Sequence, residues 1–170
     1  MKLHTALLAL VLGLAAGCQY NVPVTASHTI PVDPAVLGLW QAVPEEGKPV
    51  DADERLLVLK YSDTEYLVRY PSGKDGMYFR GYPVKIGNLV CVQIQLIGTN
   101  DGPAQADESK YHVVRYAATP DTLEVRTLNT DVVPKTAATA DELLRSIRAN
   151  LKNQDLFHDP GGFRRVGMGK

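Results

Sequence analysis

The sequence predicts a mainly β protein, an antiparallel up-and-down barrel of about eight strands with one amphipathic helix near the C-terminus. From residue 38 onward, short apolar or alternating runs recur roughly every eight to twelve residues with turn residues between them, which is typical of sandwiches and barrels. Helical periodicity is confined to one stretch, near 140–153. Sequential hairpins hide their edges best by closing into a barrel, so we expect a closed sheet.

The first strand is expected at Gly38-Leu39-Trp40, followed by a hairpin of strands 56–61 and 64–70. The dipeptide Ser62-Asp63 separates these two strands and predicts a two-residue turn. A correct register must place apolar side chains opposite each other on one face. The turn predicts these pairs on that face: Leu59 with Tyr66, and Leu57 with Val68.

Two further hairpins pass the same test of register. Strands 77–86 and 89–97 flank Gly87-Asn88, a dipeptide suited to a tight turn because both residues tolerate positive φ. This turn pairs Phe79 with Leu96 and Arg80 with Gln95. Strands 111–117 and 122–128 flank a four-residue loop, 118–121. This loop pairs Val114 with Val125, Tyr116 with Leu123 and Arg115 with Glu124.

The helix near 140–153 is expected to lie against the sheet. Thr139 and Glu142 have the spacing of a capping box, which satisfies free backbone N–H groups at a helix start. The apolar residues that follow recur on one helical face: Leu143, Leu144, Ile147 and Leu151. A last strand is expected at 163–166.

The chain resembles lipocalin-like barrel proteins in three features: Gly38-Leu39-Trp40, which matches their Gly-x-Trp, the meander of hairpins, and the late helix. The resemblance implies a cavity for a small apolar ligand, although side chains can also fill an eight-stranded barrel completely. Candidate pocket residues fall on the expected inner faces: Trp40, Tyr66, Tyr70, His112 and Tyr116. Packing alone also favours aromatic side chains in strands, so a filled core is the alternative.

The N-terminus resembles a bacterial lipoprotein signal. Lys2 precedes a short, mainly apolar run that closes on Leu14-Ala15-Ala16-Gly17-Cys18, and the 14 residues from Leu3 to Ala16 are too few to span a bilayer as a helix. The resemblance implies removal of residues 1–17 and acylation of Cys18, and Gln19 implies an outer-membrane location facing the periplasm. Ordinary signal cleavage also accepts Ala15 and Gly17, which would give a soluble periplasmic product.

Three regions are expected: a signal peptide at 1–17, a lipidated N-terminus with an extended tether at 18–35, and one barrel domain at 36–170. Pro23, Pro31 and Pro34 disfavour helix in the tether. At about 3.3 Å per extended residue, the sixteen residues from Gln19 to Pro34 would lift the barrel up to about 50 Å from the bilayer.

Charge and motifs exclude several functions. With Lys2 removed, 17 basic residues stand against 19 acidic ones, so nucleic acid is not an expected partner. The histidines lack the spacing of metal ligands, and no serine lies in a nucleophile motif. Cys91 is expected to point outward from the barrel, beneath the helix. The sequence therefore predicts no cofactor, no metal and no catalysis. We expect a membrane-anchored adaptor or inhibitor that binds another envelope protein, with a lipocalin-like carrier of a small apolar ligand as the alternative.

Overall fold

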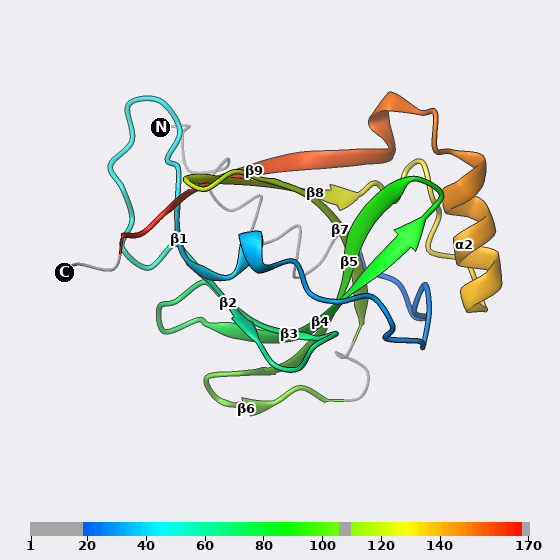
Figure 1. Cartoon of the computed structure of the whole chain (residues 1–170), viewed down its shortest axis with the longest axis horizontal. Helices are drawn as coiled ribbons and strands as arrows, with labels where there is room; N and C mark the ends of the chain where they lie inside the picture. Colours follow the sequence, from blue (N-terminus) through cyan, green and yellow to red (C-terminus); the bar gives the residue numbers. More distant parts are fainter. Residues whose placement is uncertain (1–18, 106–109, 168–170) are drawn as a thin grey trace, which may run out of the picture.

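Nine antiparallel strands and one α-helix make up the computed structural model, which describes residues 19–105 and 110–167 (Figure 1). The strands are β1 (Gly38–Ala42), β2 (Arg55–Lys60), β3 (Tyr66–Tyr70), β4 (Met77–Ile86), β5 (Leu89–Thr99), β6 (Gly102–Pro103), β7 (Tyr111–Ala118), β8 (Thr122–Leu128) and β9 (Phe157–Arg165). The helix is α2 (Ala140–Ala149), and short 3-10 turns occur at η2 (Pro34–Val36) and η3 (Gln154–Leu156).

Eight of these strands form a closed up-and-down barrel. Each strand from β1 to β5 pairs with the next, β5 pairs with β7, and β7, β8 and β9 continue in order until β9 pairs with β1. The short β6 pairs with the end of β5 and lies outside the barrel. The predicted fold class is therefore confirmed, with eight barrel strands and one late helix.

The helix α2 packs on the outside of the barrel. Thr139 Oγ1 accepts a hydrogen bond from the Glu142 N–H at 3.2 Å, as the capping box predicts. Leu143 and Ile147 are fully buried and share one apolar cluster with Val84 and Cys91 of the barrel wall. The helix is shorter than the predicted 140–153, because from Asn150 the chain tightens into turns in which N–H groups bond the carbonyl three residues back.

The hairpin registers were predicted with mixed success. The β4–β5 pairing is confirmed, since Phe79 lies opposite Leu96 and Arg80 opposite Gln95. The β7–β8 pairing is shifted by two residues, which changes the partners but keeps every side chain on its predicted face: Val114 with Thr127, Tyr116 with Val125, and Arg115 with Arg126.

The predicted β2–β3 register is wrong by one residue. Leu59 lies opposite Leu67, and Val58 lies opposite Val68. The turn between the strands is wider than two residues, since Tyr61 and Ser62 both donate backbone hydrogen bonds to the Glu65 carbonyl. A one-residue slip moves side chains to the other face of a strand. Val58 therefore points into the barrel, and Leu57 and Leu59 point outward.

Trp40 is fully buried beneath the side chain of Arg165, near the start of β1. The guanidinium carbon of Arg165 lies 4.0 Å from the centre of the indole ring, a cation–π geometry. Arg165 also donates to the carbonyls of Leu37 and Ala35, each at 2.7 Å. Gly38 has φ of +129°, and a Cβ there would lie 2.8 Å from Arg165 Nη1, so glycine lets the chain pass beneath this side chain.

The predicted tether is not a free spacer. Residues 20–33, called the strap below, are extended as the prolines indicate, but they lie along the outside of the barrel (Figure 1). Tyr20 and Val24 are 1% and 4% exposed and belong to the apolar cluster beneath α2. The domain therefore begins near residue 20, because long-range contacts that the local composition does not reveal bind the strap in place.

Candidate functional site

A cavity of about 110 Å³ lies inside the barrel. Strands β2 to β5 and β7 to β9 all contribute to its wall, and most of the lining side chains are apolar. Among the predicted pocket residues, Tyr66, Tyr70 and Tyr116 lie in this wall. Ligand pockets for drug-sized molecules usually measure about 300 to 1,000 Å³, so side chains fill most of this interior.

The tyrosine hydroxyls in the wall are bonded to groups around the cavity. Tyr116 donates to Asp33 Oδ2 at 3.0 Å, and the Asp33 N–H donates to the Tyr66 hydroxyl at 2.6 Å. Tyr70 donates to Glu54 Oε2. Burial raises the pKa of all three phenols, and the neighbouring carboxylates add to the rise at Tyr70 and Tyr116. The phenols therefore stay neutral.

Thr127, one of the residues that line the cavity, carries a buried and unpartnered hydroxyl. The residue is 5% exposed, and its Oγ1 has no hydrogen-bond partner among the described residues. Val114 and Val125 lie beside it in the same wall and offer no polar atom from their side chains. An unmade hydrogen bond of a buried hydroxyl costs about 1 to 3 kcal/mol. The hydroxyl is therefore a buried polar atom whose hydrogen bond is unmade.

The two other predicted pocket residues, Trp40 and His112, are buried but do not line the cavity. Trp40 donates its indole N–H to the Val36 carbonyl at 2.9 Å. His112 is 1% exposed and meets the Phe79 ring edge-to-face, with 6.5 Å between ring centres. Burial, with a smaller effect of Lys135, lowers the pKa of His112 to about 4. Its imidazole is therefore neutral near pH 7.

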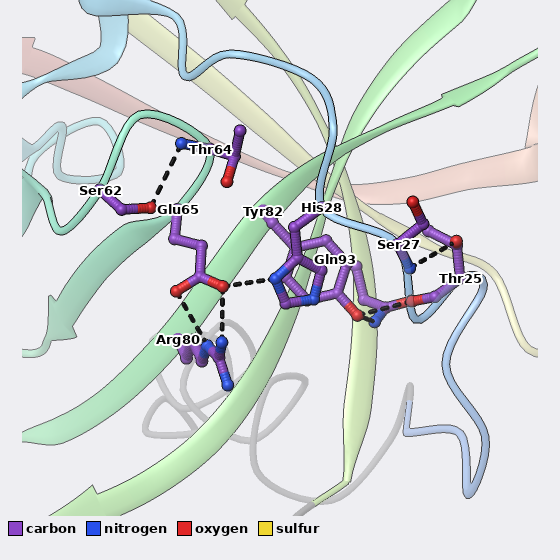
Figure 2. A network of polar contacts seen from close by, with 9 residues as sticks. All are labelled: Thr25, Ser27, His28, Ser62, Thr64, Glu65, Arg80, Tyr82 and Gln93. Carbon is purple, nitrogen blue, oxygen red and sulfur yellow. Dashed lines mark hydrogen bonds and ion pairs between the residues drawn. The ribbon is translucent and has the colours of Figure 1, made fainter.

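A polar cluster on the outside of the barrel joins the strap to β4 and to the β2–β3 turn (Figure 2). Its centre is Glu65, whose side chain is 9% exposed. The Arg80 guanidinium donates to both carboxylate oxygens, at 3.1 and 2.5 Å, and His28 Nδ1 contacts the same carboxylate. These hydrogen bonds, with that of Arg80 the largest cause, hold the pKa of Glu65 below its usual range.

Tyr82 and Gln93 extend this Glu65 cluster toward the start of the strap. The His28 ring stacks on Tyr82 with 3.6 Å between ring centres, and the Tyr82 hydroxyl donates to the Thr25 carbonyl at 2.7 Å. The side chain of Gln93, which is fully buried, donates to the Tyr82 hydroxyl and accepts from the Val24 N–H. The cluster fastens the strap to the barrel, and each of its charged groups has a partner within it.

The sequence did not reveal the Glu65 cluster. His28 lies in the segment 18–35 that the sequence predicts as a tether, and Glu65 lies beside the predicted two-residue turn Ser62-Asp63. The one available signal was the outward face of strand 89–97, where Gln93 lies beside Cys91 at a position that the barrel core does not use. A polar side chain there needs a partner, and the strap supplies it.

A row of partly exposed leucines lies on the outer face of β1, β2 and β3. The register places Leu39 opposite Leu57 and Leu59 opposite Leu67, and none of the four belongs to either buried apolar cluster. Leu59 is 44% exposed, and Tyr61 at the end of β2 is 70% exposed. We call these four leucines the leucine strip. It lies on the wall away from α2 (Figure 1).

Cys18, the predicted lipidation site, lies outside the described residues. Cys91 is fully buried beneath α2, as predicted, and burial raises the pKa of its thiol to about 12. Within residues 19–105 and 110–167, no group of three or more His, Cys, Asp or Glu side chains is placed to hold a metal ion. In the same ranges, no helix is long and apolar enough to cross a membrane.

The fold and the cavity define a closed, lipocalin-like β-barrel with a small apolar interior. No family model matches the chain, and neither the curated proteins nor the solved structures give a match.

Proposed function

We propose that this protein is a bacterial lipoprotein of the cell envelope whose barrel binds another envelope protein without catalysing a reaction. Acylated Cys18 holds it at the outer membrane, facing the periplasm. The observation that carries the binding role is the leucine strip, a row of outward apolar side chains outside both buried clusters, of which Leu59 is 44% exposed and the other three are half-buried. Contiguous exposed apolar surface marks interaction sites in soluble domains.

The position of the leucine strip supports a protein partner. Its four side chains lie on three adjacent strands, so they form one continuous surface. Tyr61 extends this surface at the end of β2, and tyrosine is enriched in protein interfaces. Covering apolar surface contributes roughly 25 cal/mol per Å². A partner with an apolar face would therefore gain from contact here.

The non-catalytic assignment rests on how the polar groups are used. Glu65, Arg80 and His28 bond one another and hold the strap. The cavity is lined mostly by apolar side chains together with Thr127, Asp159 and phenols whose pKa values are raised. A general base has to reach a substrate proton in a suitable protonation state. Glu65 and His28, the candidate bases of the outer cluster, are each engaged by a partner within it.

Fractionation of the Cys18→Ala variant tests the anchor. The wild-type protein is expected in the membrane fraction and the variant in the soluble periplasmic fraction, because acyl chains supply the membrane affinity. Recovery of both proteins in the same fraction would overturn the lipoprotein assignment.

Photocrosslinking in intact cells tests the binding surface. A photoreactive amino acid at position 59 is expected to give one adduct of defined mass, and the same group at the exposed position 124 on β8 serves as the control. The adduct should disappear when Leu57→Asp is added, because a charge would interrupt the leucine strip. Equal labelling at 59 and 124, or an adduct that survives Leu57→Asp, would contradict a specific surface.

Binding of a small apolar ligand is the second candidate, and the cavity favours it. An apolar cavity of about 150 Å³ holds benzene, so one of about 110 Å³ limits the ligand to a similar or smaller size. Benzene is expected to raise the melting temperature of the wild type and leave that of Val114→Phe unchanged, because the added ring occupies the cavity. No rise in the wild type would exclude this candidate.

A further inference from the structure

The strap fixes where a lipid anchor would join the barrel. Tyr20 and Tyr111 exchange two backbone hydrogen bonds, at 2.8 and 3.0 Å, and the Tyr20 hydroxyl donates to the Val133 carbonyl at 2.9 Å. Tyr20 is 1% exposed. The chain is therefore held at this point by its backbone and by its side chain, before β1 begins.

Cys18 precedes this fixed residue by two positions. Consecutive Cα atoms are 3.8 Å apart, so the Cα atoms of Cys18 and Tyr20 are at most about 7 Å apart. An acylated cysteine lies at the level of the lipid headgroups, since its chains enter the bilayer. The barrel wall around Tyr20 must then lie at the headgroups too.

We propose that this wall is a membrane-facing surface that rests on the phospholipid headgroups. It consists of the start of β7 at Tyr111 and the loop 129–137 between β8 and α2, whose Val133 carbonyl receives Tyr20. The inference rests on the proposed anchor at Cys18. The barrel then lies against the bilayer, whereas the predicted tether would have held it up to about 50 Å away.

The rest of the strap makes this placement durable. Gln93 accepts from the Val24 N–H, Tyr82 donates to the Thr25 carbonyl, and His28 joins Glu65. Detaching the strap would therefore break several contacts and uncover the buried Tyr20. The loop 129–137 carries both Asp131 and Lys135 as exposed charges, so contact with the bilayer does not depend on anionic lipid.

The same geometry places the opposite end of the molecule away from the bilayer. The loop 129–137, at the α2 end, and the loop 43–54, between β1 and β2, lie at opposite ends of the long axis in Figure 1. The leucine strip is on the wall of β1 to β3, away from α2. It is thus left open toward the periplasm.

Quenching by lipids tests the surface. The full-length acylated protein is reconstituted in phosphatidylcholine vesicles that contain a lipid with a quencher near the headgroup, and a fluorophore is attached at Lys135→Cys or, as the control, at Val50→Cys. Both positions are exposed, and the buried Cys91 thiol does not compete for the label. The label at 135 is expected to be quenched several-fold more than the label at 50. Equal quenching at the two positions, or stronger quenching at 50, would overturn the proposal.

An insertion provides the matched variant. About twelve Gly and Ser residues placed after Gln19 add a flexible reach of roughly 20 Å while the barrel and the strap keep their sequence. Quenching at 135 is expected to fall to the level seen at 50. Unchanged quenching at 135 would mean that the wall binds lipid independently of the anchor and would overturn the role of the short connection.

Fractionation separates this inference from the proposed function. If the acylated form is absent and the protein is soluble, both the anchor and the membrane-facing surface fail. If the protein is anchored and its labels at 135 and 50 are quenched equally, the anchor stands and only the surface fails.

Discussion

Glu65 and Arg80 form a two-point ion pair, with Nε donating to Oε2 at 3.1 Å and Nη2 to Oε1 at 2.5 Å. His28 contacts the same carboxylate from the strap, so a single side chain ties together β4, the β2–β3 turn and the N-terminal segment. The Glu65 side chain is 9% exposed, and such shielding strengthens charged hydrogen bonds.

Replacing Glu65 by Gln is expected to lower the free energy of unfolding by about 2 kcal/mol, because hydrogen bonds to charged groups contribute about 1.5 to 3 kcal/mol. Urea unfolding measures the change. The control is Glu124→Gln, which removes a carboxylate from an exposed pair with Arg126 and should cost less than about 1 kcal/mol. Similar losses in the two variants would contradict the central role of Glu65.

The effect of Glu65→Gln on stability is expected to depend on pH. The pKa of folded Glu65 is lowered from its ordinary 4.5, chiefly by the hydrogen bond from Arg80. Its stabilisation is therefore complete above pH 4.5 and is lost as the pH falls through the lower, folded-state pKa. The difference in stability between the wild type and Glu65→Gln should shrink below pH 4.5. A constant difference would show that the carboxylate charge is not responsible.

Leu56 and Leu57 provide a test of the β2 register, because they are neighbours that point to opposite sides of the barrel wall. Leu56→Ala is expected to lower the free energy of unfolding by about 2 to 5 kcal/mol, since it leaves a gap in the core. Leu57→Ala, on the leucine strip, should cost distinctly less. The reverse order would support the predicted register and contradict the structure.

Thr127→Val is expected to stabilise the protein by about 1 kcal/mol, because the buried, unpartnered hydroxyl is replaced by a methyl group of similar shape. Thermal and urea unfolding measure the gain. The control is Thr122→Val at the exposed start of β8, where Oγ1 contacts Thr119 Oγ1 at 2.7 Å and no gain is expected. A loss of stability in Thr127→Val would mean that the hydroxyl has a partner in solution.

The burial of His112 is expected to make the stability of the protein decrease in acid. Its pKa is about 4 in the folded protein and 6.5 in the absence of the fold, so the unfolded chain takes up the proton first as the pH falls. Stability should therefore decrease from about pH 6.5 down to about pH 4, by up to roughly 3 kcal/mol. His112→Phe should flatten this part of the stability curve, and an unchanged slope would refute the assignment.

The barrel and the β4–β5 hairpin could be predicted closely from the sequence, because a tight turn fixes the register of its two strands. The β2–β3 register was wrong because its turn does not. Gly87 adopts φ of +61° in a tight turn, and such a turn fixes the register of β4 and β5. In β2, the four residues 56–59 are all apolar, so alternation gives no register, and the turn 61–65 permits more than one pairing.

The strap and the Glu65 cluster were beyond the reach of local patterns. Prolines correctly indicated an extended chain, but its contacts with Tyr82, Gln93 and Tyr111 join residues far apart in sequence. Three of the five candidate pocket residues line the cavity because β3 and β7 kept their predicted faces. His112 also faces inward, yet it packs against Phe79 beyond the cavity wall.

The position of Tyr20 also sets an order of events during synthesis. Tyr20 leaves the ribosome early, whereas Tyr111, Val133 and the helix that covers its cluster are made much later. The strap therefore has no finished surface to bind until β7 and the following loop have been translated. Throughout that interval the residues near Tyr20 are not held by the barrel, and the strap can dock only as one of the last steps of folding.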